Sequence, residues 1–217
     1  MTTNLFSIFD PATTIFNLQL NWMNTMTIII MMPNFMWILP NRINFIYIKM
    51  FNILNYEMMM LYKMKNTKSP WFMFISLFMF IFINNFLSLF PYIFSSSSHM
   101  IFSLTLALPF WLFFILMSFI KNTKNTIAHL IPLNTPIYLA PLMTIIETMS
   151  IIIRPLSLGI RLTANLIAAH LLMTLLNFNS MMIIILLIQT FMMMFELCVA
   201  IIQSYVFSIL SSLYSSE

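Results

Sequence analysis

Residues 147–170 read ETMSIIIRPLSLGIRLTANLIAAH, and this stretch decides how the rest of the chain must be arranged. It is apolar enough to lie in a membrane, yet it carries Asn165 and four ionisable side chains: Glu147, Arg154, Arg161 and His170. An ionisable side chain at bilayer depth costs roughly 2.5 to 3.5 kcal/mol on insertion scales. The stretch therefore indicates a functional site inside a membrane.

The composition of the whole chain is that of a membrane protein. Hydrophobic residues make up 61% and charged residues 6% of its 217 residues, whereas soluble domains hold about 25% charged residues. We predict an all-α polytopic membrane protein in which residues 1–217 form one integral membrane domain in the lipid bilayer. The net charge of +4 comes from short basic clusters between apolar runs, which is a membrane-topology signal and argues against nucleic-acid binding.

The counts of a few residue types exclude common cofactor sites. A single glycine, Gly159, rules out both the GxxxxGK loop and the GxGxxG turn, so the chain has neither route to direct nucleotide binding. A single cysteine, Cys198, leaves no intrachain disulfide and no CxxC metal site. The three histidines fall in different segments, which argues against paired haem ligation. We expect no cofactor and no metal.

Four helices are expected in the first part of the chain. Residues 15–32 form a plausible spanning helix, and residues 42–63, with their scattered polar groups and basic tail, suit a helix lying along the membrane surface. Residues 71–90, bounded by Pro70 and Pro91, and residues 100–120 have the length and polarity of spanning helices.

Two polar features accompany these helices. We expect Asn84 and Asn85 to hydrogen-bond a neighbouring helix, and His99, which follows the sequence SSSS, to be a solvated loop residue.

The last two apolar stretches, residues 137–176 and 181–213, are too long to stand upright in a bilayer. At 1.5 Å per residue they would extend about 60 Å and about 50 Å, against a hydrocarbon core near 30 Å. They must tilt, kink or run along another protein, and Pro155 offers a natural break in the first. The short connection NFNS between them predicts an antiparallel hairpin.

Basic residues predict the orientation of these helices, because positively charged loops stay on the side from which helices insert. Residues 42–68 and 121–124 carry the basic clusters and are assigned to that side. The neutral loops SSSSH and NFNS are assigned to the other side. The N-terminus is then outside and the C-terminus inside.

Two polar stripes follow from seven-residue spacing. Glu147, Arg154 and Arg161 drift only about 20° per step and share one face of a helix, flanked by small residues that let another helix approach. His170 lies nine residues beyond Arg161, about 180° around the helix, and is expected to face a second stripe on the last helix. That second stripe is formed by Gln189, Glu196 and Gln203.

Side-chain chemistry divides the polar residues into two groups. Arginine stays protonated at ordinary pH, so Arg154 and Arg161 can pair with an anion or block a cation but cannot relay protons. Glu147, His170 and Glu196 can take up and release protons. Structural roles stay open for each: Glu147 and Arg154 could merely orient helices, His170 could be a packing residue, and the second stripe could hold helices together by hydrogen bonds.

The sequence also resembles a known family. SLGIRLTANLIAAHLL at 157–172 and FELCVAIIQSYVF at 195–207 are similar to the core motifs of subunit a (subunit 6) of mitochondrial ATP synthase. NNFLSLFPY, LTLALPFW and IIETMS support the match. The resemblance is strong over residues 70–213, whereas the N-terminal third agrees in layout more than in sequence.

The resemblance implies a proton-translocating stator subunit that binds no nucleotide itself. In that family, subunit a lies against a rotating ring of c subunits and provides two offset proton half-channels. Arg161 would pair with the ring carboxylate and stop protons passing directly between the half-channels, with Asn165 one turn further on. His170 and Glu196 would line the half-channel from the intermembrane space and Glu147 the one to the matrix, while Gln203 would lie near the ring.

The resemblance further implies other membrane-sector and peripheral-stalk subunits as partners, and a location in the mitochondrial inner membrane. The N-terminus would face the intermembrane space and the C-terminus the matrix. One departure is Ala169, where relatives usually have glycine; its extra methyl group would tighten packing beside His170.

Two other functions are compatible with intramembrane charge to different degrees. A proton-linked antiporter-like subunit of a respiratory complex would show broken helices and internal repeats, and no repeat is visible. A purely structural assembly subunit would not need Glu147, Arg161, His170 and Glu196 inside the membrane.

Overall fold

The computed structural model describes residues 5–13, 18–27, 41–62, 71–90, 93–121, 123–131, 136–176 and 182–216, and these residues form an all-helical protein. The α-helices are α2 (Arg42–Tyr62), α3 (Trp71–Ser88), α4 (Met100–Lys121), α5 (Thr123–His129), α6 (Ala140–Leu176) and α7 (Met182–Ser216). Short 3-10 helices are η1 (Leu5–Phe9), η2 (Leu20–Met26), η3 (Ser96–Ser98) and η4 (Ile137–Leu139). The predicted all-α class is confirmed, since the described residues contain no strand.

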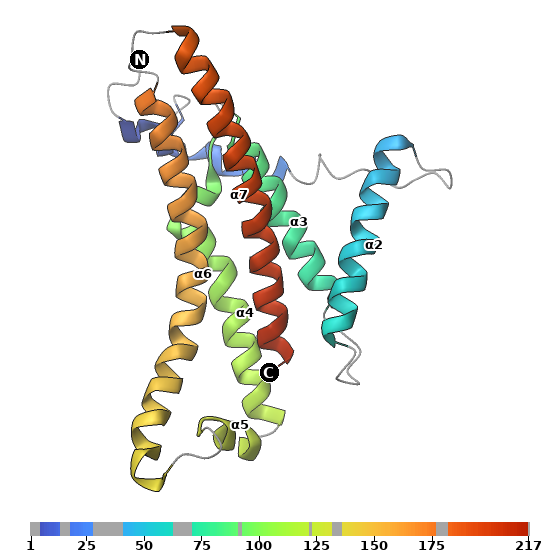
Figure 1. The fold of residues 1–217 in the computed structure, drawn as a ribbon, viewed down its shortest axis with the longest axis vertical. Helices are drawn as coiled ribbons and strands as arrows, with labels where there is room; N and C mark the ends of the chain where they lie inside the picture. The colour runs from blue at the N-terminus through green and yellow to red at the C-terminus, as the bar shows by residue number, and fades with distance from the viewer. Residues whose placement is uncertain are drawn as a thin grey trace.

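Helices α3, α4, α6 and α7 form an elongated bundle (Figure 1), in which α3 packs mainly on α7 and α4 mainly on α6. Helices α6 and α7 run in opposite directions. The four helices meet at a buried cluster made by Leu77, Ile81, Ala107, Leu158, Leu162, Leu166 and Phe207. Burial of these apolar side chains against one another stabilises the centre of the bundle.

The outer surface of the bundle is apolar, as a lipid environment requires. Exposed side chains include Phe113, Leu116 and Ile120 of α4 and Phe191 and Met194 of α7. Within the described residues, α4, α6 and residues 185–213 of α7 are long and apolar enough to cross a membrane, whereas α3 counts among the shorter apolar helices. Three long apolar helices therefore agree with a multi-pass protein.

The predicted spanning helix over residues 15–32 is not seen in the part that the structure describes. There the chain forms only η2, which lies across one end of the bundle (Figure 1). The rest of that prediction, residues 15–17 and 28–32, falls outside the described residues.

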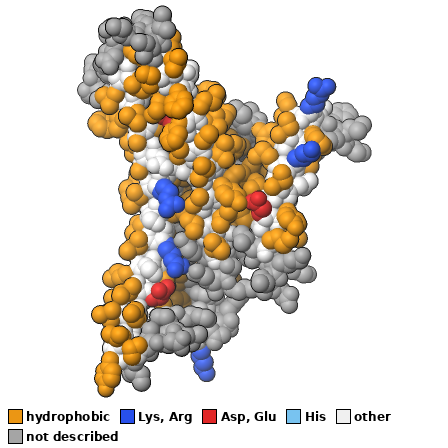
Figure 2. Space-filling model, in the orientation of Figure 1, with side chains coloured by type: hydrophobic (Ala, Val, Ile, Leu, Met, Phe, Trp, Pro, Cys, Tyr) orange, Lys and Arg blue, Asp and Glu red, His pale blue; other side chains and the backbone are white. Residues whose placement is uncertain are grey.

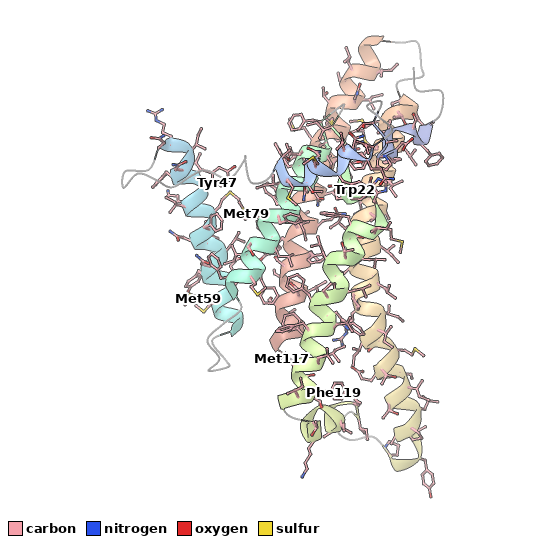
Figure 3. All side chains as sticks on the ribbon, turned by 180° about the vertical axis from the view of Figure 1, so that it is seen from behind. Trp22, Tyr47, Met59, Met79, Met117 and Phe119 are labelled. Atoms are coloured by element: carbon pink, nitrogen blue, oxygen red, sulfur yellow. The ribbon has the colours of Figure 1, made fainter. Side chains whose placement is uncertain are left out.

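Helix α2 lies to one side of the bundle and contacts α3 and α7. A second buried cluster joins α2 to α3 through Leu54, Met58 and Met79, with Tyr47 packed against it (Figure 3). The Tyr205 hydroxyl of α7 donates a hydrogen bond of 3.0 Å to Glu57 Oε2 of α2. This helix matches the predicted residues 42–63, and its position along the membrane surface stays a prediction.

In the linker between α3 and α4, residues 95–98 are buried and His99 is half-buried, so the expectation that His99 is solvated is wrong. The His99 ring is half-buried, with its centroid 5.2 Å from that of Trp22 and 5.3 Å from that of Phe94. Asn24 Nδ2 donates to the Phe94 carbonyl oxygen at 2.9 Å. The four serines before His99 are buried as well. Helix η2, which carries Trp22 (Figure 3), packs against η3 and so shields His99 and the serines before it.

Asn84 and Asn85 near the end of α3 are buried, but three of their four polar side-chain atoms lack the expected hydrogen bond to another helix in the described chain. Asn84 Nδ2 and both polar side-chain atoms of Asn85 have no partner within the described part of the chain.

Helix α6 continues through Pro155, so the expected break does not occur. The helix bends near its middle and remains one element (Figure 1). Proline removes the hydrogen bond to the carbonyl four residues earlier, here that of Ile151. The Trp111 side chain of α4 donates to that carbonyl oxygen at 3.0 Å, which lets the helix continue.

Gly159 lies where α4 and α6 approach closely. A Cβ atom at this position would lie 3.2 Å from Leu104 Cδ2 and 3.7 Å from the Ser103 carbonyl carbon. The single glycine of the chain thus allows a close helix crossing, one turn from the buried Thr163.

Candidate functional site

Arg161 and Asn165 lie on an exposed face of α6. Their neighbours on this face are the small residues Ser157, Ala164 and Ala168, which are exposed too. Figure 2 shows basic side chains along α6 on a surface that is otherwise largely apolar. An arginine on an apolar face surrounded by small side chains leaves room for another helix to approach its guanidinium group.

Glu147 and Arg154 form an ion pair on α6, with Arg154 Nη2 3.9 Å from Glu147 Oε1. The two side chains are 41% and 33% exposed, respectively. The contact joins two turns of one helix, so it does not orient two helices against each other. Arg154, to which neither spacing nor resemblance gave a role, therefore lies beside the acidic group of its own stripe.

A cavity of about 250 Å³ lies between α6 and α7. Its lining is mostly apolar, and its polar members are Asn165 of α6 and Glu196 and Gln203 of α7. Glu196 is half-buried, and its Oε1 atom is buried with no hydrogen-bond partner among the described residues. Ala169 also lines the cavity. The hairpin therefore brings one protonatable carboxyl group beside two amide side chains.

Gln203 joins the two long helices at the level of Arg161. Its Nε2 atom donates to the Arg161 carbonyl oxygen at 3.4 Å, and its side chain is buried. The bond uses only the backbone of Arg161, so the guanidinium group stays available on the exposed face. The two predicted stripes are thus joined by a hydrogen bond. It involves the backbone carbonyl of Arg161 and not the charged guanidinium group.

His170 does not face the α7 stripe as expected. Its ring lies edge-on to Phe9 of η1, with ring centroids 6.0 Å apart, and within hydrogen-bonding reach of the Ser88 backbone. It is not among the residues that line the cavity with Glu196, and its Nε2 atom is buried without a partner in the described chain. His170 lies on the other side of α6 from Arg161, as the spacing predicted. The space that it faces is occupied by α3 and η1, however, and not by α7.

The side chains that surround His170 were not found from the sequence. Phe9 lies in a segment with no motif, and the motif NNFLSLFPY, which contains Ser88, supported the family resemblance without indicating a contact with His170. Within the described residues, no three histidine, cysteine, aspartate or glutamate side chains come together as metal ligands.

Comparison with known proteins assigns this arrangement to a family. The model of the family described as ATP synthase A chain matches residues 18–216, which is nearly the whole chain. The chain belongs to the ATP synthase A chain family. It is therefore a subunit of ATP synthase, a proton-transporting complex, and the family match takes in every residue of the site from Glu147 to Gln203.

Curated relatives agree with this assignment over their full length. The chain is 80% identical over 217 residues to the ATP synthase F(0) complex subunit a of Rhopalosiphum padi, covering 100% of both chains. It is 49% identical over 224 residues to ATP synthase subunit a of Aedes aegypti and 47% identical over 223 residues to that of Drosophila melanogaster. Both alignments cover 100% of this chain and 99% of the relative.

Proposed function

We propose that this protein conducts protons through two half-channels that meet a rotating c-subunit ring, with Arg161 as the barrier between them. The observation that carries the proposal is the order of groups along α6. Glu147 lies fourteen residues before Arg161, about 21 Å along the helix axis, whereas the cavity with Glu196 lies beyond Arg161 at the level of Asn165. Two proton-carrying groups thus lie on opposite sides of a fixed positive charge.

The chemistry of these groups supports a path with two separate ends. A proton from the intermembrane space reaches Glu196, with His170 on the same side of Arg161, and neutralises a ring carboxylate. The ring carries it almost a full turn to a path at Glu147, which releases it to the matrix. Arg161 keeps its proton and so pairs with a charged ring carboxylate without passing a proton on.

The energy for ATP synthesis comes from the membrane potential and the proton gradient. Each charge crossing is worth about 2.3 kcal/mol per 100 mV, so several protons must cross for each ATP made. The proposal also assigns the chain to the mitochondrial inner membrane, with the N-terminus toward the intermembrane space and the C-terminus toward the matrix. Its partners are the c ring, other membrane-sector subunits and the peripheral stalk.

A proton-linked antiporter-like subunit would instead place its site on interrupted helices near the middle of the membrane. The unbroken α6 and α7 of the described chain favour a subunit that follows the surface of a ring. Purification of the intact membrane sector tests the difference, because a stator subunit co-purifies with c subunits and an antiporter-like subunit does not.

Glu196→Gln is expected to reduce ATP-driven proton pumping about a hundredfold, the lower end of what loss of a proton-transferring group costs. The amide keeps the size of the side chain but cannot release a proton. Pumping is measured in vesicles that contain the intact ATP synthase, with Glu196→Asp as the control that keeps a carboxyl group. Equal pumping by the Gln variant and the unmodified protein would remove Glu196 from the path.

Glu147→Gln is expected to slow proton translocation by a smaller factor, because Glu147 is partly exposed and water can share its task. Arg154→Gln is the matched control, since it breaks the same ion pair but leaves the carboxyl group in place. Proton flux in reconstituted vesicles should fall clearly in the first variant and little in the second. A larger loss in Arg154→Gln would mean that the ion pair, and not the proton-carrying carboxyl group, is needed.

A further inference from the structure

Pro155 leaves one carbonyl group of α6 without its usual donor. A proline in a helix lacks the N–H that would bond the carbonyl four residues earlier, and its ring crowds that carbonyl. Here the affected group is the Ile151 carbonyl, and Pro155 itself is buried. In a membrane an unpaired backbone carbonyl costs several kcal/mol unless a neighbouring group supplies the missing donor.

Trp111 of α4 supplies this donor. Its Nε1 atom lies 3.0 Å from the Ile151 carbonyl oxygen, and an indole has no other polar hydrogen. The adjoining cavity, lined by Trp111, Pro155, Leu158 and Phe207 among others, measures about 10 Å³. This volume is at the lower limit for one water molecule, so water does not compete well with the indole in this position.

The bond lies at a critical place along α6. Pro155 follows Arg154 directly and precedes Arg161 by six residues, so it separates the segment with Glu147 from the segment with Arg161. A change of about 10° in the bend would move a group six residues away by roughly 1.5 Å, given a rise of 1.5 Å per residue. Displacements of this size matter wherever two groups must meet in one geometry.

We propose that Trp111 is a positioning residue for proton transfer: its indole N–H replaces the missing Pro155 N–H and holds the bend that places Arg161 relative to Glu147. This inference rests on the proposed roles of those two residues. Trp111 does not touch a reacting group, and it acts through the Ile151 carbonyl alone.

The test is a double-mutant cycle in the intact ATP synthase, read as protons pumped per ATP hydrolysed. Trp111→Phe keeps an aromatic ring and removes the donor. It should lower this ratio by up to about threefold, because an interhelical hydrogen bond of average strength in a membrane protein changes the equilibrium between two helix geometries by about that factor. Pro155→Ala restores a backbone N–H for the Ile151 carbonyl. In the Pro155→Ala background, the same Trp111→Phe change should therefore have no effect.

An equal loss in both backgrounds would overturn the proposal, because it would show that only the bulk of the indole matters. No loss in either background would overturn it too. If Trp111→Phe prevents assembly, the amount of assembled subunit is measured in the same cycle. Recovery of assembly by Pro155→Ala supports the proposal, and continued loss overturns it.

Glu196→Gln is measured in parallel to test the proposed function separately. Normal pumping by this variant would count against the proposed function. The assembly and thermal stability of the Trp111 and Pro155 variants would still test the hydrogen bond from Trp111.

Discussion

Arg161→Ala is expected to abolish proton-coupled ATP synthesis while the subunit still assembles. Removing the guanidinium group removes the positive charge that, in the proposal, separates the Glu196 cavity from the path at Glu147, so protons pass between the two paths without turning the ring. Assembly should persist because the Arg161 side chain is exposed and its backbone bond to Gln203 does not depend on the side chain.

Two measurements separate these effects. ATP synthesis driven by an imposed proton gradient should fall to background, and passive proton leak through the membrane sector should rise. Arg154→Ala is the matched control: it removes an arginine from the same helix, seven residues earlier, on the Glu147 side of the proposed barrier. Normal ATP synthesis by Arg161→Ala would refute the barrier role. An equal proton leak in the Arg161→Ala and Arg154→Ala variants would show that the leak follows from any loss of positive charge on α6 and not from loss of Arg161 in particular.

Gly159→Leu is expected to cause the largest loss of assembled protein. Even the first side-chain atom would lie 3.2 Å from Leu104 Cδ2 and 3.7 Å from the Ser103 backbone, so a longer side chain must push α4 away from α6. Overpacking of this kind typically costs about 1 to 3 kcal/mol and more where backbone must move. The displacement would also pull Trp111 from the Ile151 carbonyl.

The amount and thermal stability of the subunit in purified ATP synthase measure this loss. Gly159→Ala is the matched control and should be tolerated far better, because its single methyl group meets mainly the flexible end of Leu104. Leu104→Ala should relieve the remaining strain in Gly159→Ala. Normal amounts of the Gly159→Leu variant would show that the α4–α6 crossing is looser than these distances require.

The helices of the second half of the chain could be predicted because long apolar runs have no other stable form in a bilayer. Residues 100–120 and 181–213 anticipated α4 and α7 closely, and the stripes with Arg161 and Glu196 followed from seven-residue spacing within single helices. The prediction was weaker for residues 15–32, where polar side chains interrupt the apolar pattern and the described part is a 3-10 helix.

Contacts between segments far apart in the sequence could not be predicted in the same way. Spacing placed His170 opposite Arg161, but which neighbour it meets depends on how α3 and η1 pack at that end of the bundle. Likewise, the sequence predicted a solvated loop position for His99, because nothing in it indicates that Trp22, which is distant in sequence, packs against the His99 ring. The same limit applies to Trp111, because nothing in its own segment indicates that it pairs with the carbonyl freed by Pro155.

The sequence by itself determined the all-helical membrane character of this protein and which residues share a face of α6, because both follow from local periodicity and from the cost of charge in lipid. Only the tertiary structure decided that Arg161 stays exposed while Glu196 and Asn165 line one cavity, and that Trp111 completes the hydrogen bonding of α6. These features depend on how neighbouring helices are rotated and how closely they approach, which is set by packing across the bundle rather than by any one helix.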